Sequence, residues 1–232
     1  AISKSALFPT HFWLPAAMAA PTPVSAYLHA AAMVKAGNYL VARFAPGFAA
    51  TDWWIPITVS LGLGKMIFGG WVALRQNDLK LILAYGSVSQ LGFITAVISF
   101  GSADTAMAGM GMVMAHGLFK ATLFLCVGII DHQAGTRDNR TLSVVGRSAP
   151  KLLVVSLIGA ASMAGVPPLF GFVTKEAVLT GLVDHSGEPL GMILLVGVVV
   201  GSILTFAYSA RFMWGGFARN SGQFSALDTA AD

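Results

Sequence analysis

The stretch Ser162 to Glu176 reads SMAGVPPLFGFVTKE, and it places Pro167 and Pro168 at the end of a long apolar run, just before Lys175 and Glu176. Proline removes a backbone donor and disrupts a helix, and in lipid the freed carbonyls find no water to hydrogen-bond them. Broken backbone at this depth is tolerated only against protein or a water-filled cavity. Two interpretations follow: an ordinary helix end with a solvated ion pair, or a discontinuous membrane helix beside an ion path.

The composition indicates a membrane protein. Of the 232 residues, 56% are hydrophobic and 10% are charged, whereas soluble domains carry about 25% charged residues. Apolar stretches near the ~20 residues that cross a bilayer recur along the chain. The ~10-residue alternating segments of a membrane β-barrel are missing. We therefore expect an all-α, polytopic transmembrane helical bundle.

The apolar segments predict six full spans after an incomplete N-terminal one. The chain begins at Ala1 without a recognisable signal peptide, which suggests a fragment of a longer protein. We expect residues 1–213 to form one transmembrane domain, and residues 214–232 to form a tail or linker on the cytoplasmic side. The six predicted spans are Val24–Phe44, Trp53–Leu74, Leu81–Phe100, Thr105–Ile130, Leu152–Phe172 and Leu190–Met213.

Basic residues in the connections fall mostly on one side of these spans. Arg43 and Lys175 lie on the other side. The positive-inside rule then places loops 75–80 and 131–151 and the C-terminus in the cytoplasm. We expect the membrane to be a bacterial inner (plasma) membrane. This distribution explains the net charge of +4 without a nucleic-acid partner. The eight residues of the basic side are Arg75, Lys80, Arg137, Arg140, Arg147, Lys151, Arg211 and Arg219.

Histidines and lysines occur inside the predicted spans, where a charge at the helix centre costs about 2.5–3.5 kcal/mol. His116 and Lys120 are four residues apart, so on a helix they share a face and can exchange a proton directly or through one water. Lys120 lies too deep to snorkel easily, which favours a functional role. For Lys35 and Lys65, snorkelling or a position at a miscounted span end explains the residue as well as a functional role does. His29 has no local partner.

The sequence shows none of the common motifs for nucleotide binding, metal binding or nucleophilic catalysis. It contains no phosphate-binding glycine loop, no Cys/His metal spacing and no nucleophile elbow. The single cysteine, Cys126, excludes an internal disulfide and lies in an apolar run. We therefore predict no cofactor and assign no metal ligands.

A segment near the N-terminus is similar in sequence to the segment that follows Pro167 and Pro168. The segment SKSAL, Ser3 to Leu7, precedes Pro9 and has the same order of residue types as TKEAV, Thr174 to Val178. Lys4 and Lys175 would then be equivalent residues of two repeats, five spans apart. An odd number of spans inverts the second repeat in the membrane, and inverted repeats with interrupted helices are typical of secondary transporters.

Several long motifs carry a family likeness. The segments Lys4–Phe44, Asp78–Phe93, Ala115–Leu125 and Gly165–Leu179 resemble the antiporter-like subunits shared by Mrp-type cation/proton antiporters and respiratory complex I. The sequences FPTHFWLP, PTPVSAYLHAAAMVKAG and DHQAGTRD are most similar to the A-type subunits of Mrp-type Na⁺/H⁺ antiporters. The likeness covers nearly the whole chain.

The resemblance implies inverted five-helix repeats, each with a discontinuous helix, joined by a buried chain of lysines, histidines and carboxylates. Lys120 is the implied central proton carrier and His116 its relay. Lys175 with Glu176 forms the gate at the second break. The other implied residues of the proton path are Lys4, His29 and Lys80, and the implied helix breaks lie at Pro9, Pro167 and Pro168.

Two departures limit what the resemblance implies. The glutamate that partners the first lysine in the family has no counterpart, and Ala16 stands where many relatives have Asp or Asn. The first half-channel is therefore incomplete, and the chain alone is not expected to transport ions.

The implied function is that of a membrane subunit of a multisubunit Na⁺/H⁺ antiporter, a secondary transporter rather than an enzyme. Its expected partners are other antiporter subunits, protons, Na⁺ or another monovalent cation, and the lipid bilayer. Two alternatives stay open. One is a proton-pumping subunit of NADH:quinone oxidoreductase, part of a translocase, and the other is a non-transporting structural membrane subunit.

Overall fold

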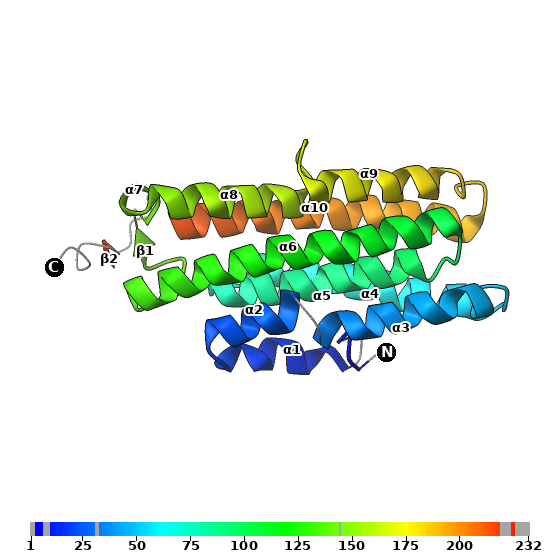
Figure 1. The fold of residues 1–232 in the computed structure, drawn as a ribbon, viewed down its shortest axis with the longest axis horizontal. Helices are drawn as coiled ribbons and strands as arrows, with labels where there is room; N and C mark the ends of the chain where they lie inside the picture. The colour runs from blue at the N-terminus through cyan, green and yellow to red at the C-terminus, as the bar shows by residue number, and fades with distance from the viewer. Residues whose placement is uncertain (1–2, 7–9, 31–32, 144, 219–223, 226–232) are drawn as a thin grey trace.

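The computed structural model describes residues 3–6, 10–30, 33–143, 145–218 and 224–225 of the chain. The helices run roughly along the long axis of the molecule (Figure 1). The described residues form one two-residue parallel strand pair, β1 (Leu142–Ser143) with β2 (Phe224–Ser225). The expected all-α fold is therefore confirmed, with this small pair added at one end of the bundle.

Four helices are long and apolar enough to cross a membrane, namely α4 (Trp54–Arg75), α5 (Leu79–Ile98), α6 (Ala103–Ala134) and α10 (Pro189–Phe217). α5 is the innermost helix, because all but two of its residues are buried. It packs against α4, α6 and α10. The remaining helices are η1 (Thr10–Phe12), α1 (Trp13–Ala16), η2 (Ala17–Ala19), α2 (Thr22–Ala30), α3 (Met33–Phe48), α7 (Val145–Ser148), α8 (Pro150–Ala164) and α9 (Phe170–Val183).

Local sequence signals set several helix ends. Asp78 caps α5 by accepting hydrogen bonds from the Lys80 and Leu81 amides, at 2.7 and 3.3 Å. Ser102 caps α6 in the same way through the Thr105 amide, at 3.2 Å. α6 ends at Gly135, whose positive φ of 63° suits glycine. Such caps satisfy backbone groups that a helix end leaves unpaired.

The six predicted spans are not six single helices. The predicted span Val24–Phe44 is covered by α2 and α3, of 9 and 16 residues. The predicted span Leu152–Phe172 ends early, because α8 stops at Ala164. α10 in turn continues to Phe217, so the tail boundary drawn after Met213 falls inside this helix. Long apolar runs thus overestimate helix length where the backbone is interrupted.

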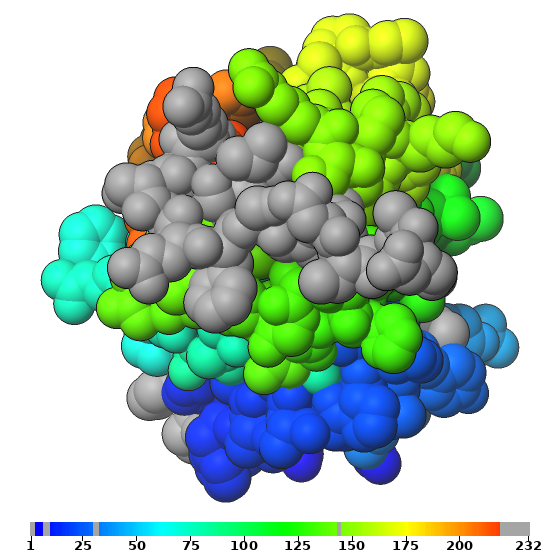
Figure 2. Space-filling view, turned by 90° about the vertical axis from the view of Figure 1, so that its left-hand side faces the viewer, coloured from blue at the N-terminus to red at the C-terminus, as the bar shows by residue number. Residues whose placement is uncertain are grey.

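The proline stretch does interrupt the backbone. α8 ends with Gly165 at a φ of +89°, and α9 starts at Phe170 after the prolines. α8 and α9 follow one another along the same side of the bundle (Figure 1). Seen from the end that carries β1, α8 and the N-terminal elements lie on opposite sides of α6 (Figure 2). The break therefore lies partway along the length of the bundle rather than at one of its ends.

The start of α9 touches the end of α8 so closely that only glycine fits at position 171. A Cβ on Gly171 would lie 1.8 Å from the Ser162 carbonyl oxygen. The Gly171 amide also donates to the Ser162 hydroxyl at 3.2 Å.

Gly171→Ala is expected to destabilise the protein, since α9 must move away from α8. Overpacking of this kind costs about 1–3 kcal/mol. The expected result is a lower melting temperature of the full-length protein in its complex. Gly47→Ala is the matched control, because no atom lies within 4 Å of its added Cβ. Equal melting temperatures for the two variants would contradict the close approach.

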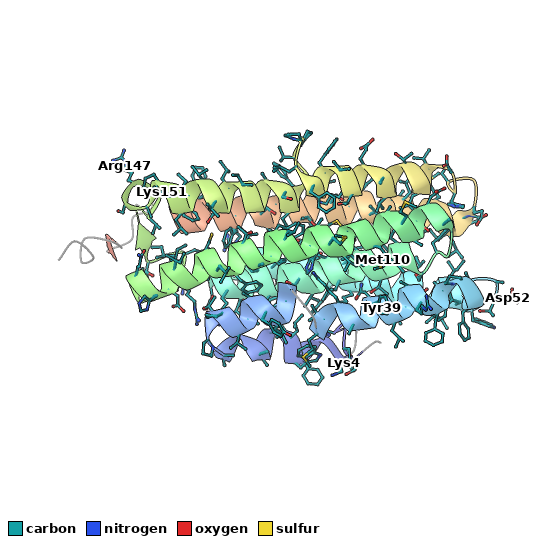
Figure 3. The ribbon with its side chains drawn as sticks, in the orientation of Figure 1. Lys4, Tyr39, Asp52, Met110, Arg147 and Lys151 are labelled. Atoms are coloured by element: carbon teal, nitrogen blue, oxygen red, sulfur yellow. The ribbon has the colours of Figure 1, made fainter. Side chains whose placement is uncertain are left out.

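Charges separate along the long axis. Arg147 and Lys151 lie at the end that carries α7 and β1, and Asp52 lies at the opposite end (Figure 3). Two linked ion pairs join the loops of the basic end, Arg137 to Asp78 at 3.3 Å and Arg137 to Asp131 at 3.4 Å. These charged side chains thus lie at the two ends of the bundle.

Candidate functional site

The interior of the bundle contains an unusual set of basic side chains. Their exposed fractions are between 0 and 8%. No aspartate or glutamate is buried in the part of the chain that the structure describes. Charged residues are almost never fully buried without a charged partner. The set comprises His29, Lys65, Lys80, His116, Lys120 and Lys175.

Lys120 lies at the centre of this set. Its ammonium donates to the Leu83 carbonyl of α5 at 2.8 Å. A Cβ on Gly86 would lie 3.1 Å from the Lys120 Nζ and 3.0 Å from the Tyr208 ring, so the amine lies where α5, α6 and α10 meet. His116 is one turn earlier on α6 and is also completely buried. The predicted pair therefore lies in the protein interior.

The two buried histidines lack hydrogen-bond partners. His29 stacks on Phe124 of α6, with ring centroids 4.7 Å apart. His116 packs edge-on against Phe119 at 5.5 Å. Neither ring nitrogen of either histidine has a partner among the described residues. Buried polar groups are normally hydrogen-bonded, so these imidazoles are not explained as simple structural residues.

A polar cluster that the sequence did not reveal borders Lys120. The Gln90 amide donates to the Thr205 hydroxyl at 2.9 Å and to the Tyr208 hydroxyl at 3.3 Å. The Tyr208 hydroxyl is 3.5 Å from the Gly86 carbonyl. These residues are uncharged, and they come from spans that are far apart in sequence. The available signal was a glutamine within the apolar segment 81–100.

Lys175 binds the broken end of α8. Its ammonium donates to the Met163 and Ala164 carbonyls, both at 3.0 Å. These carbonyls belong to the last turn of α8, where the helix leaves acceptors unpaired and carries partial negative charge. The proline break thus creates the binding site for the lysine that follows it.

The predicted ion pair between Lys175 and Glu176 is absent among the described residues. Consecutive residues of a helix do not face one another. Lys175 therefore points to α8, while Glu176 is exposed. Glu176 lines a cleft of about 580 Å³ between α6 and α9, together with Asp104 and Asp184.

The N-terminal turn forms a second lysine–carbonyl site. Lys65 of α4 is 1% exposed and donates to the Ser5 carbonyl, so the snorkelling interpretation is wrong for this residue. The Ser5 hydroxyl donates to Asn38 Oδ1 at 2.6 Å and to the Val34 carbonyl at 3.0 Å. The turn at Ser3–Ala6 is therefore bound to both α3 and α4.

Lys4 and Lys175 differ in their surroundings. Lys4 is exposed in this chain, whereas Lys175 is buried. Residues 3–6 form a turn in which Ala6 has a positive φ of 50°, so the side chains do not follow the order of a helix. The predicted break residue Pro9 lies outside the described residues.

The last predicted member, Lys80, lies away from the centre. It occupies the first turn of α5 and donates to the Ala20 carbonyl, which precedes α2. It is nevertheless 1% exposed. Lys80 joins the start of α5 to the N-terminal elements at the basic end of the bundle.

Comparison with known proteins identifies the family. The model of the NADH:quinone oxidoreductase/Mrp antiporter transmembrane family matches residues 1–205. The chain belongs to this family. The family includes membrane parts of NADH:quinone oxidoreductases and of Mrp antiporters.

Individual members of this family are closely similar. The chain is 44% identical to a probable K⁺/H⁺ antiporter protein of the A/B type from Rhizobium meliloti, over 94% of the chain and 22% of that protein. It is 43% identical to the A-type subunit of the Na⁺/H⁺ antiporter of Bacillus subtilis, over 95% of the chain and 30% of that protein. The chain therefore spans less than a third of these relatives.

A solved structure agrees with the fold. The Mrp complex from Dietzia sp. DQ12-45-1b contains a chain that matches with a TM-score of 0.88 and 45% identity. The match covers 93% of this chain and 24% of the other. The helical arrangement described above is thus one found within a multisubunit membrane complex.

Proposed function

We propose that this chain is the proton-translocating part of the A-type subunit of a multisubunit antiporter that exchanges protons for Na⁺ or another monovalent cation. The observation that carries the proposal is the set of buried basic side chains without a buried carboxylate among the described residues. Each buried lysine of the set donates to a backbone carbonyl instead.

Carbonyl partners suit a lysine that must gain and lose a proton. A carbonyl accepts a hydrogen bond from either an ammonium or a neutral amine, and because it carries no net charge it favours the ammonium less strongly than a carboxylate does. Lys120 and Lys175 both have such partners. They can therefore change protonation state without losing the hydrogen bond that positions them.

The proposed path has Lys120 as central carrier and His116 as relay, with His29 on the neighbouring helix α2. Their unpartnered ring nitrogens support proton transfer through ordered water, the usual partner of such groups. Lys175 is the proposed gate at the second break, and the exposed Glu176 lines the cleft between α6 and α9. Like charges in a low-dielectric interior repel, and the proposed gating is that the charge of Lys175 biases the protonation of Lys120 in this way.

The first break is the proposed counterpart of the second in an inverted repeat. Near the proposed first break the buried Lys65 binds the carbonyl of residue 5, and at the second break the buried Lys175 binds the carbonyls of residues 163–164. Lys4 and Lys80 are proposed to supply protons to the centre in the assembled protein. The end that carries Arg147 and Lys151 is the proposed cytoplasmic side, in agreement with the positive-inside rule.

The function is tested with the full-length protein and its partner subunits in everted membrane vesicles that lack other antiporters. After respiration has acidified the vesicles, added NaCl is expected to release protons, which a pH-sensitive dye reports. Replacing NaCl with KCl identifies the cation, since relatives are named for Na⁺ and for K⁺. No proton release with any monovalent cation would contradict the proposal.

A proton-pumping subunit of NADH:quinone oxidoreductase is the second candidate, because the same family model covers both kinds of complex. In that case vesicles should lose NADH-driven acidification when this subunit is deleted. For an antiporter, the same deletion leaves NADH-driven acidification intact and removes the cation-dependent proton release.

A further inference from the structure

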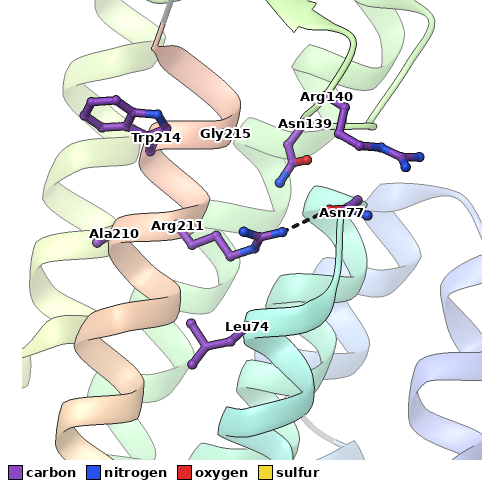
Figure 4. A pocket seen from close by; sticks show the side chains of 8 residues that line it. All are labelled: Leu74, Asn77, Asn139, Arg140, Ala210, Arg211, Trp214 and Gly215. Carbon is purple, nitrogen blue, oxygen red and sulfur yellow. Dashed lines mark hydrogen bonds between the residues drawn. The ribbon is translucent and has the colours of Figure 1, made fainter. Parts of the chain in front are cut away.

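A pocket of about 760 Å³ lies at the basic end of the bundle, between the C-terminal ends of α4 and α10 and the loop that follows α6 (Figure 4). It is separate from the buried lysines. Arg211 of α10 points across it toward Asn77 (Figure 4). Leu74, Ala210 and Trp214 contribute to its apolar side.

Arg211 brings positive charge into this pocket. Its guanidinium donates to the Gln76 carbonyl at 3.1 and 3.2 Å and to Asn77 Oδ1 at 2.9 Å. These acceptors are neutral. The ion pairs of the described residues are formed by Arg137 and Arg140, so Arg211 has no carboxylate partner among them. Its charge is available to an anion.

Arg140 at the rim is already paired with a carboxylate. Its Nη2 lies 2.5 Å from Asp138 Oδ2. Hydrogen bonds from the Arg140 side chain and backbone lower the pKa of the Asp138 carboxyl. The Arg140 side chain is nevertheless 69% exposed. Arg140 can therefore provide a second hydrogen-bond donor for an anion in the pocket while it stays paired with Asp138.

The position of the pocket along the bundle matches the level expected for a membrane surface. α4 and α10 are both long enough to cross a bilayer, and the last turns of these two helices line the pocket. Trp214 is 73% exposed, as expected for an indole at the lipid–water interface. On α4, the Arg75 guanidinium lies 5.2 Å from the centre of the Trp71 ring. The pocket thus combines hydrogen-bond donors with apolar side chains, as a site for the junction between a lipid headgroup and its acyl chains requires.

We propose that this pocket binds the headgroup of an anionic phospholipid. The lipid phosphate accepts hydrogen bonds from Arg211 and Arg140, whose planar guanidinium groups match phosphate geometry. The acyl chains follow Leu74 and Ala210 into the bilayer. Basic pockets between membrane helices on the cytoplasmic side are recognised sites for such headgroups. The site links α4 to α10, so an occupied pocket holds the two helices together.

The test measures the melting temperature of the full-length protein in its purified complex. Mixed micelles of phosphatidylcholine with and without phosphatidylglycerol are the probes. Phosphatidylglycerol is expected to raise the melting temperature of the wild type by several degrees. Arg211→Gln is expected to lose most of this shift. Arg147→Gln is the control, because Arg147 is an exposed arginine at the same end but outside the pocket.

Three outcomes would overturn the proposal. The first is an equal shift with both lipids, and the second is a full shift in Arg211→Gln. The third is a shift of the same size with inorganic phosphate alone, which identifies a site for free phosphate. If Arg211→Gln prevents assembly, the Arg140→Gln variant is used instead, because Arg140 is exposed. An undiminished melting-temperature shift with phosphatidylglycerol in that variant would also contradict the site. Native mass spectrometry should also show less retained phosphatidylglycerol in the arginine variants of the pocket than in Arg147→Gln.

Discussion

Lys120→Met in the full-length protein is expected to reduce cation-dependent proton release in everted vesicles by about 10²–10⁴-fold, the range for loss of a positioned proton-transfer group. Lys120 is completely buried, and its partner is the Leu83 carbonyl at 2.8 Å. Methionine fills a similar space without a titratable group. No buried carboxylate among the described residues loses a partner, so the complex is expected to assemble normally.

Two further variants separate proton transfer from structural support. Lys120→Arg keeps the positive charge but cannot release its proton, so it is also expected to be inactive. Lys151→Met is the control, because Lys151 is exposed. If Lys120→Met assembles and exchanges at the wild-type rate, the proposed carrier is wrong. A variant that fails to assemble favours a purely structural role of the chain instead.

Lys175→Met is expected to give the second largest loss, at least tenfold in exchange, with a lower melting temperature. The Met163 and Ala164 carbonyls lose the donor that holds them at 3.0 Å. They lie at the end of α8, where other donors are scarce in a membrane protein. The charge that Lys120 is proposed to respond to is removed at the same time.

Glu176→Gln is the matched comparison for the gate. Glu176 is exposed and forms no ion pair with Lys175, so this variant is expected to retain most of the exchange activity. Proton release in vesicles is measured for both variants at several cation concentrations. Equal losses would mean that the carboxylate acts together with the lysine, and the assignment of the gate to Lys175 and the α8 carbonyls would then be wrong.

Much of the fold was predictable because it depends on local chemistry. Apolar length predicts spans, and four of the predicted segments correspond to α4, α5, α6 and α10. The predicted span Val24–Phe44 overestimates helix length, because an apolar run does not show whether its backbone is continuous. The helix does end before Pro167 and Pro168, because proline acts on the backbone wherever it occurs.

The candidate site was predictable where spacing alone decides it. His116 and Lys120 share a helix, so their four-residue separation is enough to place them together. Lys65 was ambiguous because its partner, the Ser5 carbonyl, is 60 residues away. The cluster of Gln90, Thr205 and Tyr208 could not be found, since its contacts join residues 115 and 118 positions apart.

The sequence by itself determined that this chain is a membrane bundle of the antiporter-like family, with a helix break beside Lys175 and a buried pair at His116 and Lys120. The membrane class, the helix break and the His116–Lys120 pair follow from composition, proline chemistry and helical periodicity, which need no knowledge of neighbours. The family follows from the resemblance of the long sequence motifs. Only the tertiary structure decided that Lys175 binds carbonyls and not Glu176. It also decided that Lys65 is buried while Lys4 is exposed. The physical reason is that the partner of a buried charge comes from another helix, whose position only packing determines.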